Sequence, residues 1–271
     1  MRSGSSRLGQ LLSGLLLFGL GATFGLWFEW YSGLLESLVT RAAPGPEAGA
    51  PQDLELGGLE ARLRETPGDI GLGSAYRLKC VELEAHERSV LFFEELSREH
   101  PGEPAAGLQL ALAYADKIPT RTGLASFMAK GQLAQRSLEQ LDAVIVLRPD
   151  WWPAVFSRAM NQLHWPRALN RSEAAARDFE RLIELQAAES AGPRPHFVRA
   201  HLGLGDARAK GGDLEGARFA WEQGLVRFPE SEALRLRLNL AGAEAAQAFL
   251  GTEYSLEGAI DTDLGFLVRE P

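Results

Sequence analysis

Apolar residues recur along much of this chain at the three- and four-residue spacing of a helix face, in paired stretches separated by helix breakers. The clearest pair lies between Pro195 and Pro229. Its first stripe is Leu202, Leu204 and Ala207, its break is Gly211-Gly212-Asp213, and its second stripe is Leu214, Ala217, Phe219, Trp221 and Leu225. Each helix is too short to bury its stripe alone, so we expect the two to pack together and against further pairs.

Prolines divide the chain into intervals that indicate four such pairs. Pro67 and Pro101 are 34 residues apart, and so are Pro195 and Pro229. The two intervals between them meet at Pro149 and are longer, at 48 and 46 residues. We therefore expect two ordinary units that flank two expanded ones. The additional residues are expected in loops at 117–123, 164–171 and 188–194 and in a long helix over 124–147.

The same spacing predicts which residues of the other three pairs face inward. They are Leu72, Tyr76, Cys80, Ser89, Phe93 and Leu96 in the first, Leu110, Ala111, Tyr114, Ser137, Leu141 and Val144 in the second, and Val155, Ala159, Ala175, Phe179 and Leu182 in the third. A lone helix with Leu54, Leu56, Leu59 and Leu63 is expected to cover one end of the stack, and a helix over 232–250 the other. No stretch alternates for long in the manner of a strand, so the expected fold is all-α.

The fourth pair resembles the signature of the tetratricopeptide repeat (TPR) family. Read from Val198, it carries Leu204-Gly205, Ala217, Trp221 and Pro229 in the order and spacing of that signature. His201 and Arg208 stand where the signature has tryptophan and tyrosine. The resemblance covers residues 53–250 and implies a tetratricopeptide-like α-α superhelix of about four helix-turn-helix units with capping helices. The resemblance predicts the architecture but does not identify the function, because folds of this kind serve many partners.

The N-terminal part of the chain predicts a membrane anchor. An uncharged run of 21 residues begins at Leu8 and ends at Phe28, which as a helix is long enough to cross the hydrocarbon layer. Arginines precede it and acidic residues follow it, which predicts a single pass through a bacterial inner membrane, with a cytoplasmic N-terminus and a periplasmic remainder. A cleaved signal peptide is the alternative. The expected parts are the anchor (1–31), an amphipathic stretch and Pro/Gly/Ala linker (32–52), the repeat domain (53–250) and a tail (251–271).

Composition and charge exclude several classes of function. The net charge is −8 and no basic run follows the N-terminus, so we expect no nucleic-acid partner. The one cysteine, Cys80, lies on an inward-facing stripe, which predicts a buried thiol. The five histidines form no metal-binding motif, and the glycines form no phosphate-binding loop. We therefore expect no metal, no cofactor and no enzymatic activity.

The TPR resemblance also implies that the first helices of successive units line a concave groove, which holds a segment of a partner protein. By position, the lining would be Leu108, Leu112, Asp116, Phe156, Met160, His164, Arg199, Leu202, Asp206 and Lys210, together with Ser74, Leu78 and Leu163. The middle of this set is apolar and its last unit is charged, which suits an amphipathic partner segment. The alternative for Leu108, Leu112 and Leu163 is an ordinary place in the core. The expected function is that of a membrane-tethered adaptor or assembly factor for an envelope complex.

The expanded third unit leaves a second function open. Trp151, Trp152 and Trp165 lie in it, and they would either pin its enlarged loop to the stack or form a binding hot spot. Asn161 and His164 lie one helical turn apart and would join the tryptophans in the pocket of a ligand-binding or enzymatic protein.

The tail leaves a third alternative. Residues 259–268 are acidic and then apolar, and their apolar side chains would be costly to leave wholly in water. Beside a frayed terminus, we consider a segment that folds back across the stack or enters the groove of another copy. The second of these would make the chain a self-associating envelope component.

Overall fold

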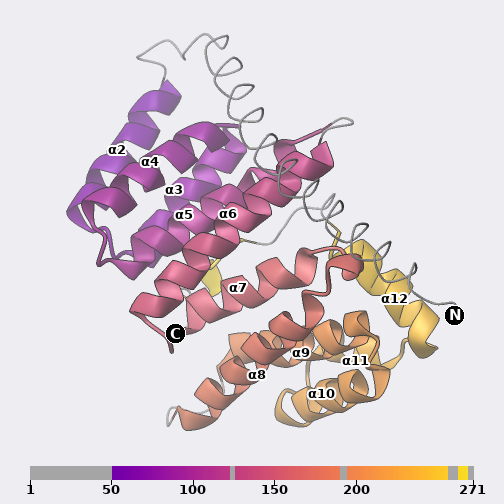
Figure 1. The fold of residues 1–271 in the computed structure, drawn as a ribbon. Helices are drawn as coiled ribbons and strands as arrows, with labels where there is room; N and C mark the ends of the chain where they lie inside the picture. Colours follow the sequence, from indigo (N-terminus) through magenta and orange to yellow (C-terminus); the bar gives the residue numbers. More distant parts are fainter. Residues whose placement is uncertain (1–50, 123–125, 190–193, 256–261, 268–271) are drawn as a thin grey trace, which may run out of the picture. The chain divides into compact units, whose positions relative to one another are not determined.

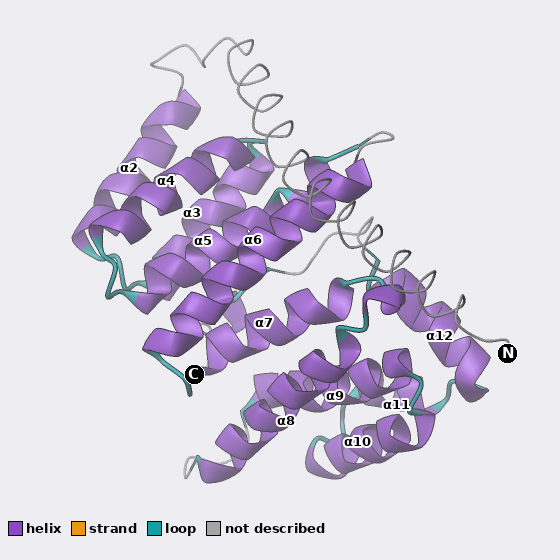
Figure 2. Ribbon diagram, in the orientation of Figure 1, coloured by secondary structure: helices purple, strands orange, loops and turns teal. Residues whose placement is uncertain are grey.

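A computed structural model describes residues 51–122, 126–189, 194–255 and 262–267, and the regular structure of these residues is entirely helical (Figures 1 and 2). The α-helices are α2 (Pro51–Glu65), α3 (Ile70–Glu82), α4 (His86–Glu99), α5 (Pro104–Asp116), α6 (Ser126–Leu147), α7 (Trp152–His164), α8 (Ser172–Ala188), α9 (Val198–Gly211), α10 (Leu214–Arg227), α11 (Glu232–Leu238) and α12 (Gly242–Glu253). Single-turn 3-10 helices are η1 (Ile118–Thr120), η2 (Arg167–Leu169), η3 (Pro195–Phe197) and η4 (Gly265–Leu267). The all-α prediction is confirmed for this part of the chain.

The four predicted helix pairs are present as α3–α4, α5–α6, α7–α8 and α9–α10, and local signals fix several of their ends. The side chains of Asp69, Glu103 and Asp213 accept hydrogen bonds from backbone N–H groups in the first turns of α3, α5 and α10. Helix α9 ends where Gly212 takes a left-handed conformation with φ of 104°. The predicted break between the two stripes of this pair is therefore confirmed.

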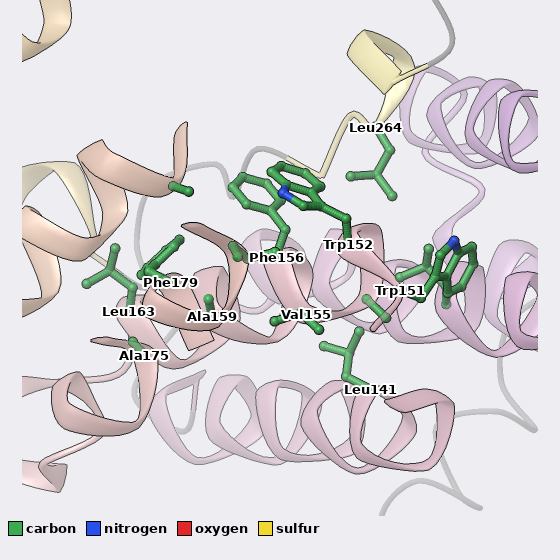
Figure 3. Packing of buried hydrophobic residues seen from close by; sticks show 14 of the residues in the cluster. Leu141, Trp151, Trp152, Val155, Phe156, Ala159, Leu163, Ala175, Phe179 and Leu264 are labelled. Carbon is green, nitrogen blue, oxygen red and sulfur yellow. The ribbon is translucent and has the colours of Figure 1, made fainter. Parts of the chain in front are cut away.

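Successive pairs stack so that their first helices are neighbours, since α3 contacts α5, α5 contacts α7, and α7 contacts α9. Most of the positions predicted to face inward are buried between these helices and their second helices. Those at most 2% exposed are Tyr76, Cys80, Ser89, Phe93, Leu96, Ala111, Ser137, Leu141, Val155, Ala159, Ala175, Phe179 and Leu182. Figure 3 shows the part of this core that surrounds α7.

Two glycines on α9 allow its neighbours to approach closely. A Cβ atom built on Gly203 would lie 2.2 Å from Cζ of Phe179 on α8. On Gly205 it would lie 2.1 Å from Nε1 of Trp221 on α10. Atoms cannot approach that closely, so both positions require a residue without a side chain. Gly205 is the glycine of the TPR-like signature, and the close approach of Trp221 explains why glycine stands at this position.

The prediction of one continuous terminal helix over residues 232–250 is wrong, because two helices cover this range. Helix α11 ends at Leu238, and α12 begins at Gly242, whose φ of 90° breaks the helical path between them. The prediction that Phe219 belongs to the inward stripe of α10 is also wrong, because its side chain is 60% exposed. Phe219 is two residues from both Ala217 and Trp221, which places it on the opposite side of the helix.

The predicted membrane anchor and most of the predicted linker fall in residues 1–50, which lie outside the described residues. Residues from Pro51 onward form their own compact unit, and α2 begins two residues before the expected start of the repeat domain at Asp53. Among the described residues, no helix is both long enough and apolar enough to cross a bilayer.

Candidate interaction groove

The C-terminal segment, residues 262–267, lies across the face formed by the first helices of the units. Its Thr262 is bonded to residues of α3 and α5, including Asp116 at the end of α5. Its Phe266 contacts Trp152 at the start of α7 and Arg199 near the start of α9. The segment therefore runs antiparallel to the first helices. We name this face of α3, α5, α7 and α9 the first-helix groove. Among the possibilities considered for the tail, the structure shows a segment that folds back across the stack.

A buried arginine holds the beginning of the segment. Arg77 on α3, with 0% of its surface exposed, donates from Nη1 to the hydroxyl of Thr262 (2.8 Å) and from Nη2 to the carbonyl oxygen of Thr262 (2.5 Å). The carboxylate of Asp116 lies 2.5 Å from Arg77 Nη1 and accepts a further hydrogen bond from the Thr262 hydroxyl. Gln109 accepts from Arg77 Nε at 3.0 Å and fixes the guanidinium. The buried charge of Arg77 is thus paired, and four of its five N–H donors make hydrogen bonds.

Apolar and aromatic contacts hold the end of the segment. Leu264 is 2% exposed and packs in the core around α7, where Figure 3 shows it close to Trp152 and Phe156. The ring of Phe266 meets the rings of Trp152 and Phe156 nearly edge-on, with centroids 6.3 and 6.0 Å apart. The guanidinium carbon of Arg199 lies 4.2 Å from the centroid of the Phe266 ring, within range of a cation–π contact.

Beneath the segment lies a hollow between α5, α6 and α7. Four of the predicted groove residues line it, namely Leu112, Phe156, Met160 and His164. Thr262 and Leu264 of the C-terminal segment close it from the other side. With Asp116 bound to Thr262 and Arg199 over Phe266, six of the ten predicted groove residues meet on one face.

The other four predicted groove residues lie elsewhere. Leu108 is 0% exposed and belongs to the core, the place considered for it as the alternative, and Leu202 packs among α9, α10 and α12. Asp206 and Lys210 are buried and make internal hydrogen bonds. These two charged side chains of the fourth unit are therefore not accessible to a partner, contrary to the expectation from the sequence.

Asp206 is the centre of a buried network that joins α9 to the C-terminal helices. Its carboxylate accepts hydrogen bonds from Trp221 Nε1 (3.1 Å), Arg237 Nη2 (3.1 Å) and the Tyr254 hydroxyl (2.5 Å). Burial and the Asp206 carboxylate raise the pKa of Tyr254 well above its usual range, so the phenol remains a donor. Helices α11 and α12 thus cover the part of α9 that an open groove would have exposed.

Lys210 is a buried cation on the same helix. Its Nζ donates to the carbonyl oxygen of Leu163 on α7 at 2.5 Å, and burial lowers the pKa of Lys210 to about 8. Because a neutral amine can still donate this hydrogen bond, the contact between α9 and α7 does not depend on the charge.

Replacing Lys210 with methionine is expected to change how stability depends on pH. Between pH 8 and 10 the unfolded lysine keeps a proton that the folded lysine has lost, so the contribution of Lys210 to the free energy of unfolding rises with pH. The free energy of unfolding of the wild type minus that of Lys210→Met should therefore rise over this range, by at most about 1.4 kcal/mol per pH unit. Urea unfolding at pH 8, 9 and 10 measures it. Lys79→Met, at a surface lysine whose pKa is raised by Glu82, is the control and should show a constant difference; a constant difference for Lys210→Met would contradict the prediction.

The tryptophan-rich third unit is tied into the stack. Trp165 Nε1 donates to Asn161 Oδ1 at 3.0 Å, and Asn161 Nδ2 donates to the carbonyl oxygen of Ala134 on α6 at 3.1 Å. His164 Nδ1 lies 2.9 Å from the carbonyl oxygen of Met160. Trp165 therefore pins the loop through Asn161, as one of the two interpretations of the tryptophans expects. Among the described residues, no group of three or more His, Cys, Asp or Glu side chains is arranged to hold a metal ion.

Sequence reasoning missed the two residues that define the polar end of the groove, Arg77 and Thr262. Arg77 lies four residues after Gly73 and three before Cys80, so it falls on the buried stripe of α3. A charged residue on an inward stripe signals a buried partner, and that signal was present in the sequence. Nothing in the spacing could have identified the partner as Thr262, which is 185 residues away along the chain.

Comparison with known proteins supports the fold and goes no further. The sequence matches no protein-family model and no curated protein sequence. The structure is similar to the crystal structure of a thermophilic TPR protein from Thermus thermophilus, with a TM-score of 0.50 and 18% sequence identity. The match covers 72% of this chain and 90% of that chain. The part of the chain that the structure describes therefore has an all-helical, TPR-like fold.

Proposed function

We propose that this chain is an interaction scaffold, tethered to a membrane by its N-terminal apolar run, which holds a segment of a partner protein in the first-helix groove. One observation supports this above the others. A stretch of polypeptide, residues 262–267, already lies in that groove and is bound through its main chain, a hydroxyl and an aromatic ring. A face that binds one segment of chain in this way offers the same contacts to another.

The tether and its location are proposed from the sequence. The uncharged run from Leu8 to Phe28, with arginines before it and acidic residues after it, favours a single-pass anchor in a bacterial inner membrane and a periplasmic repeat domain. A scaffold held there would act as an adaptor or assembly factor for an envelope complex. Retention of the chain in the membrane pellet after extraction with alkaline carbonate tests the tether independently of any partner.

An enzymatic function finds less support. Asn161 bonds to Trp165 and to the main chain of α6, and His164 bonds within its own helix and meets the ring of Tyr254 edge-on at 5.2 Å. These two residues therefore stabilise the third unit, and neither is left without a partner there. The proposal is accordingly a non-enzymatic scaffold.

Site-specific photo-crosslinking in native membranes tests the proposed function. The full chain would carry a photoreactive amino acid in place of Met160, which lines the hollow of the first-helix groove. We expect a distinct protein to be joined at this position and identified by mass spectrometry. The matched control carries the same amino acid in place of Val146, which is 80% exposed on α6. Capture of the same proteins at both positions, or of none at Met160 in a folded chain, would count against the proposal.

A further inference from the structure

We infer that the partner segment carries the same chemical pattern as the C-terminal segment: a serine or threonine, an aliphatic residue two positions later, and an aromatic residue two positions after that. This pattern is Thr262, Leu264 and Phe266 in the chain itself. The partner binds by displacing the C-terminal segment from the first-helix groove. The inference rests on the proposed function and adds to it the chemistry of the partner and a self-occupied state.

The first position requires a hydroxyl group. The Thr262 hydroxyl accepts from Arg77 and donates to Asp116 at the same time. Among side chains of this size, only serine and threonine can do both at one oxygen atom. A carboxylate would be repelled by Asp116, an ammonium group would be repelled by Arg77, and an apolar side chain would leave both buried groups short of a partner.

The second position requires an aliphatic side chain. Leu264 is 2% exposed and faces the hollow, whose lining includes Leu112, Phe156 and Met160. A charged side chain there would have to lose its water without gaining a partner of opposite charge. Burial of a leucine-sized side chain contributes roughly 1.5 to 3 kcal/mol, which makes this position a large part of the binding free energy.

The third position favours an aromatic ring. Phe266 is surrounded by the rings of Trp152, Phe156 and His196, with centroids 5.7 to 6.3 Å away. The Arg199 guanidinium lies against its face. An aliphatic side chain would retain the burial and lose both the edge-on ring contacts and the cation–π contact.

The C-terminal segment competes with any partner because it belongs to the same chain. It follows α12 after a connection of residues 254–261, so its effective concentration at the groove is of millimolar order. The apparent affinity for a partner therefore equals the intrinsic affinity of the open groove multiplied by the fraction of chains whose groove is open. Changes that release the segment should raise the affinity for a peptide of the same pattern.

A peptide-binding experiment on the purified full chain in mild detergent tests the inference. The probe is a fluorescein-labelled peptide with the sequence of residues 259–268, and fluorescence anisotropy reports its binding. The chain that carries Leu264→Asp and Phe266→Ala should bind this peptide at least tenfold more tightly than the wild-type chain. Val146→Asp, which adds a charge at an exposed position, should bind like the wild type. Circular dichroism at 222 nm checks that each chain is folded.

Changes in the peptide test the pattern itself. On the tail-substituted chain, Thr262→Val and Phe266→Ala in the peptide should each weaken binding about tenfold. Replacing Arg199 with alanine in the chain should weaken the unchanged peptide and leave the affinity of the Phe266→Ala peptide unaltered, which loss of folding would not do. Equal affinities of the wild-type and tail-substituted chains, or of the three peptides, would overturn the inference.

Two other outcomes separate this inference from its alternatives. A wild-type chain that is dimeric by light scattering, with a monomeric tail-substituted chain, would mean that the segment is exchanged between copies, and the inferred foreign partner would be rejected. Capture of a protein at Met160 in membranes without peptide binding would leave the scaffold function standing and reject the pattern. Peptide binding without capture of any protein would reject the scaffold function and keep the site.

Discussion

Replacing Asp206 with alanine is expected to lower the free energy of unfolding by about 3 to 5 kcal/mol. The substitution removes the buried carboxylate that the guanidinium of Arg237 faces at 3.1 Å and leaves it only Glu253, which is 3.7 Å away and 49% exposed. It also removes the acceptor of Trp221 Nε1 and of the Tyr254 hydroxyl. Urea unfolding of the full chain in mild detergent, followed by circular dichroism at 222 nm, measures the change.

The control for this prediction is Asp142→Ala. Asp142 also faces an arginine, Arg158, at 2.9 Å, but its side chain is 56% exposed and Arg158 keeps a second partner in Asp178. Its loss should therefore change the free energy of unfolding by less than about 1 kcal/mol. Equal losses of stability from the two substitutions would contradict the prediction that the buried network around Asp206 stabilises the fold more than an exposed ion pair does.

Replacing Gly205 with alanine is expected to destabilise the chain by about 3 kcal/mol. The added Cβ would overlap the indole of Trp221, which is 1% exposed and held by Asp206, so neither the ring nor α10 can move aside cheaply. The midpoint of urea unfolding should fall with little change in its slope.

Gly131→Ala is the matched control for the glycine on α9. Gly131 lies inside α6, and a Cβ built on it would meet no atom within 4 Å beyond its chain neighbours and the backbone of its own helix. Alanine there should raise the free energy of unfolding by about 0.4 to 1 kcal/mol, because the unfolded chain loses conformational freedom. Equal effects of the two substitutions on the free energy of unfolding would contradict the steric role of Trp221 at Gly205.

The helix pairs and most of their buried positions could be predicted because they depend on local periodicity. Ala175, Phe179 and Leu182 follow one another at helical spacing, and all are fully buried on α8. Where the period was not respected, as for Phe219, the prediction failed. The proline spacing placed the units correctly because each proline falls in or near a turn between helices.

The groove could be predicted only in part, because its final lining depends on contacts between distant residues. Periodicity indicates which face of α9 carries Asp206, but it cannot show that Arg237 and Tyr254 return to cover that face. The attachment of the tail depends on Arg77 and Thr262, which no repeat pattern relates to each other. Six predicted groove residues meet because they lie on the parts of the first helices that face the C-terminal segment and the hollow beneath it.

The course of the C-terminal segment also affects how the chain unfolds. In a repeat array each unit contacts only its neighbours, so the terminal units can melt before the rest. Here the segment that follows α12 is bonded to Arg77 on α3 and contacts Arg199 on α9, so it bridges the first and fourth units. Release of either outer unit then breaks its contacts with the segment, which opposes fraying from the ends and couples the stability of the two outer units.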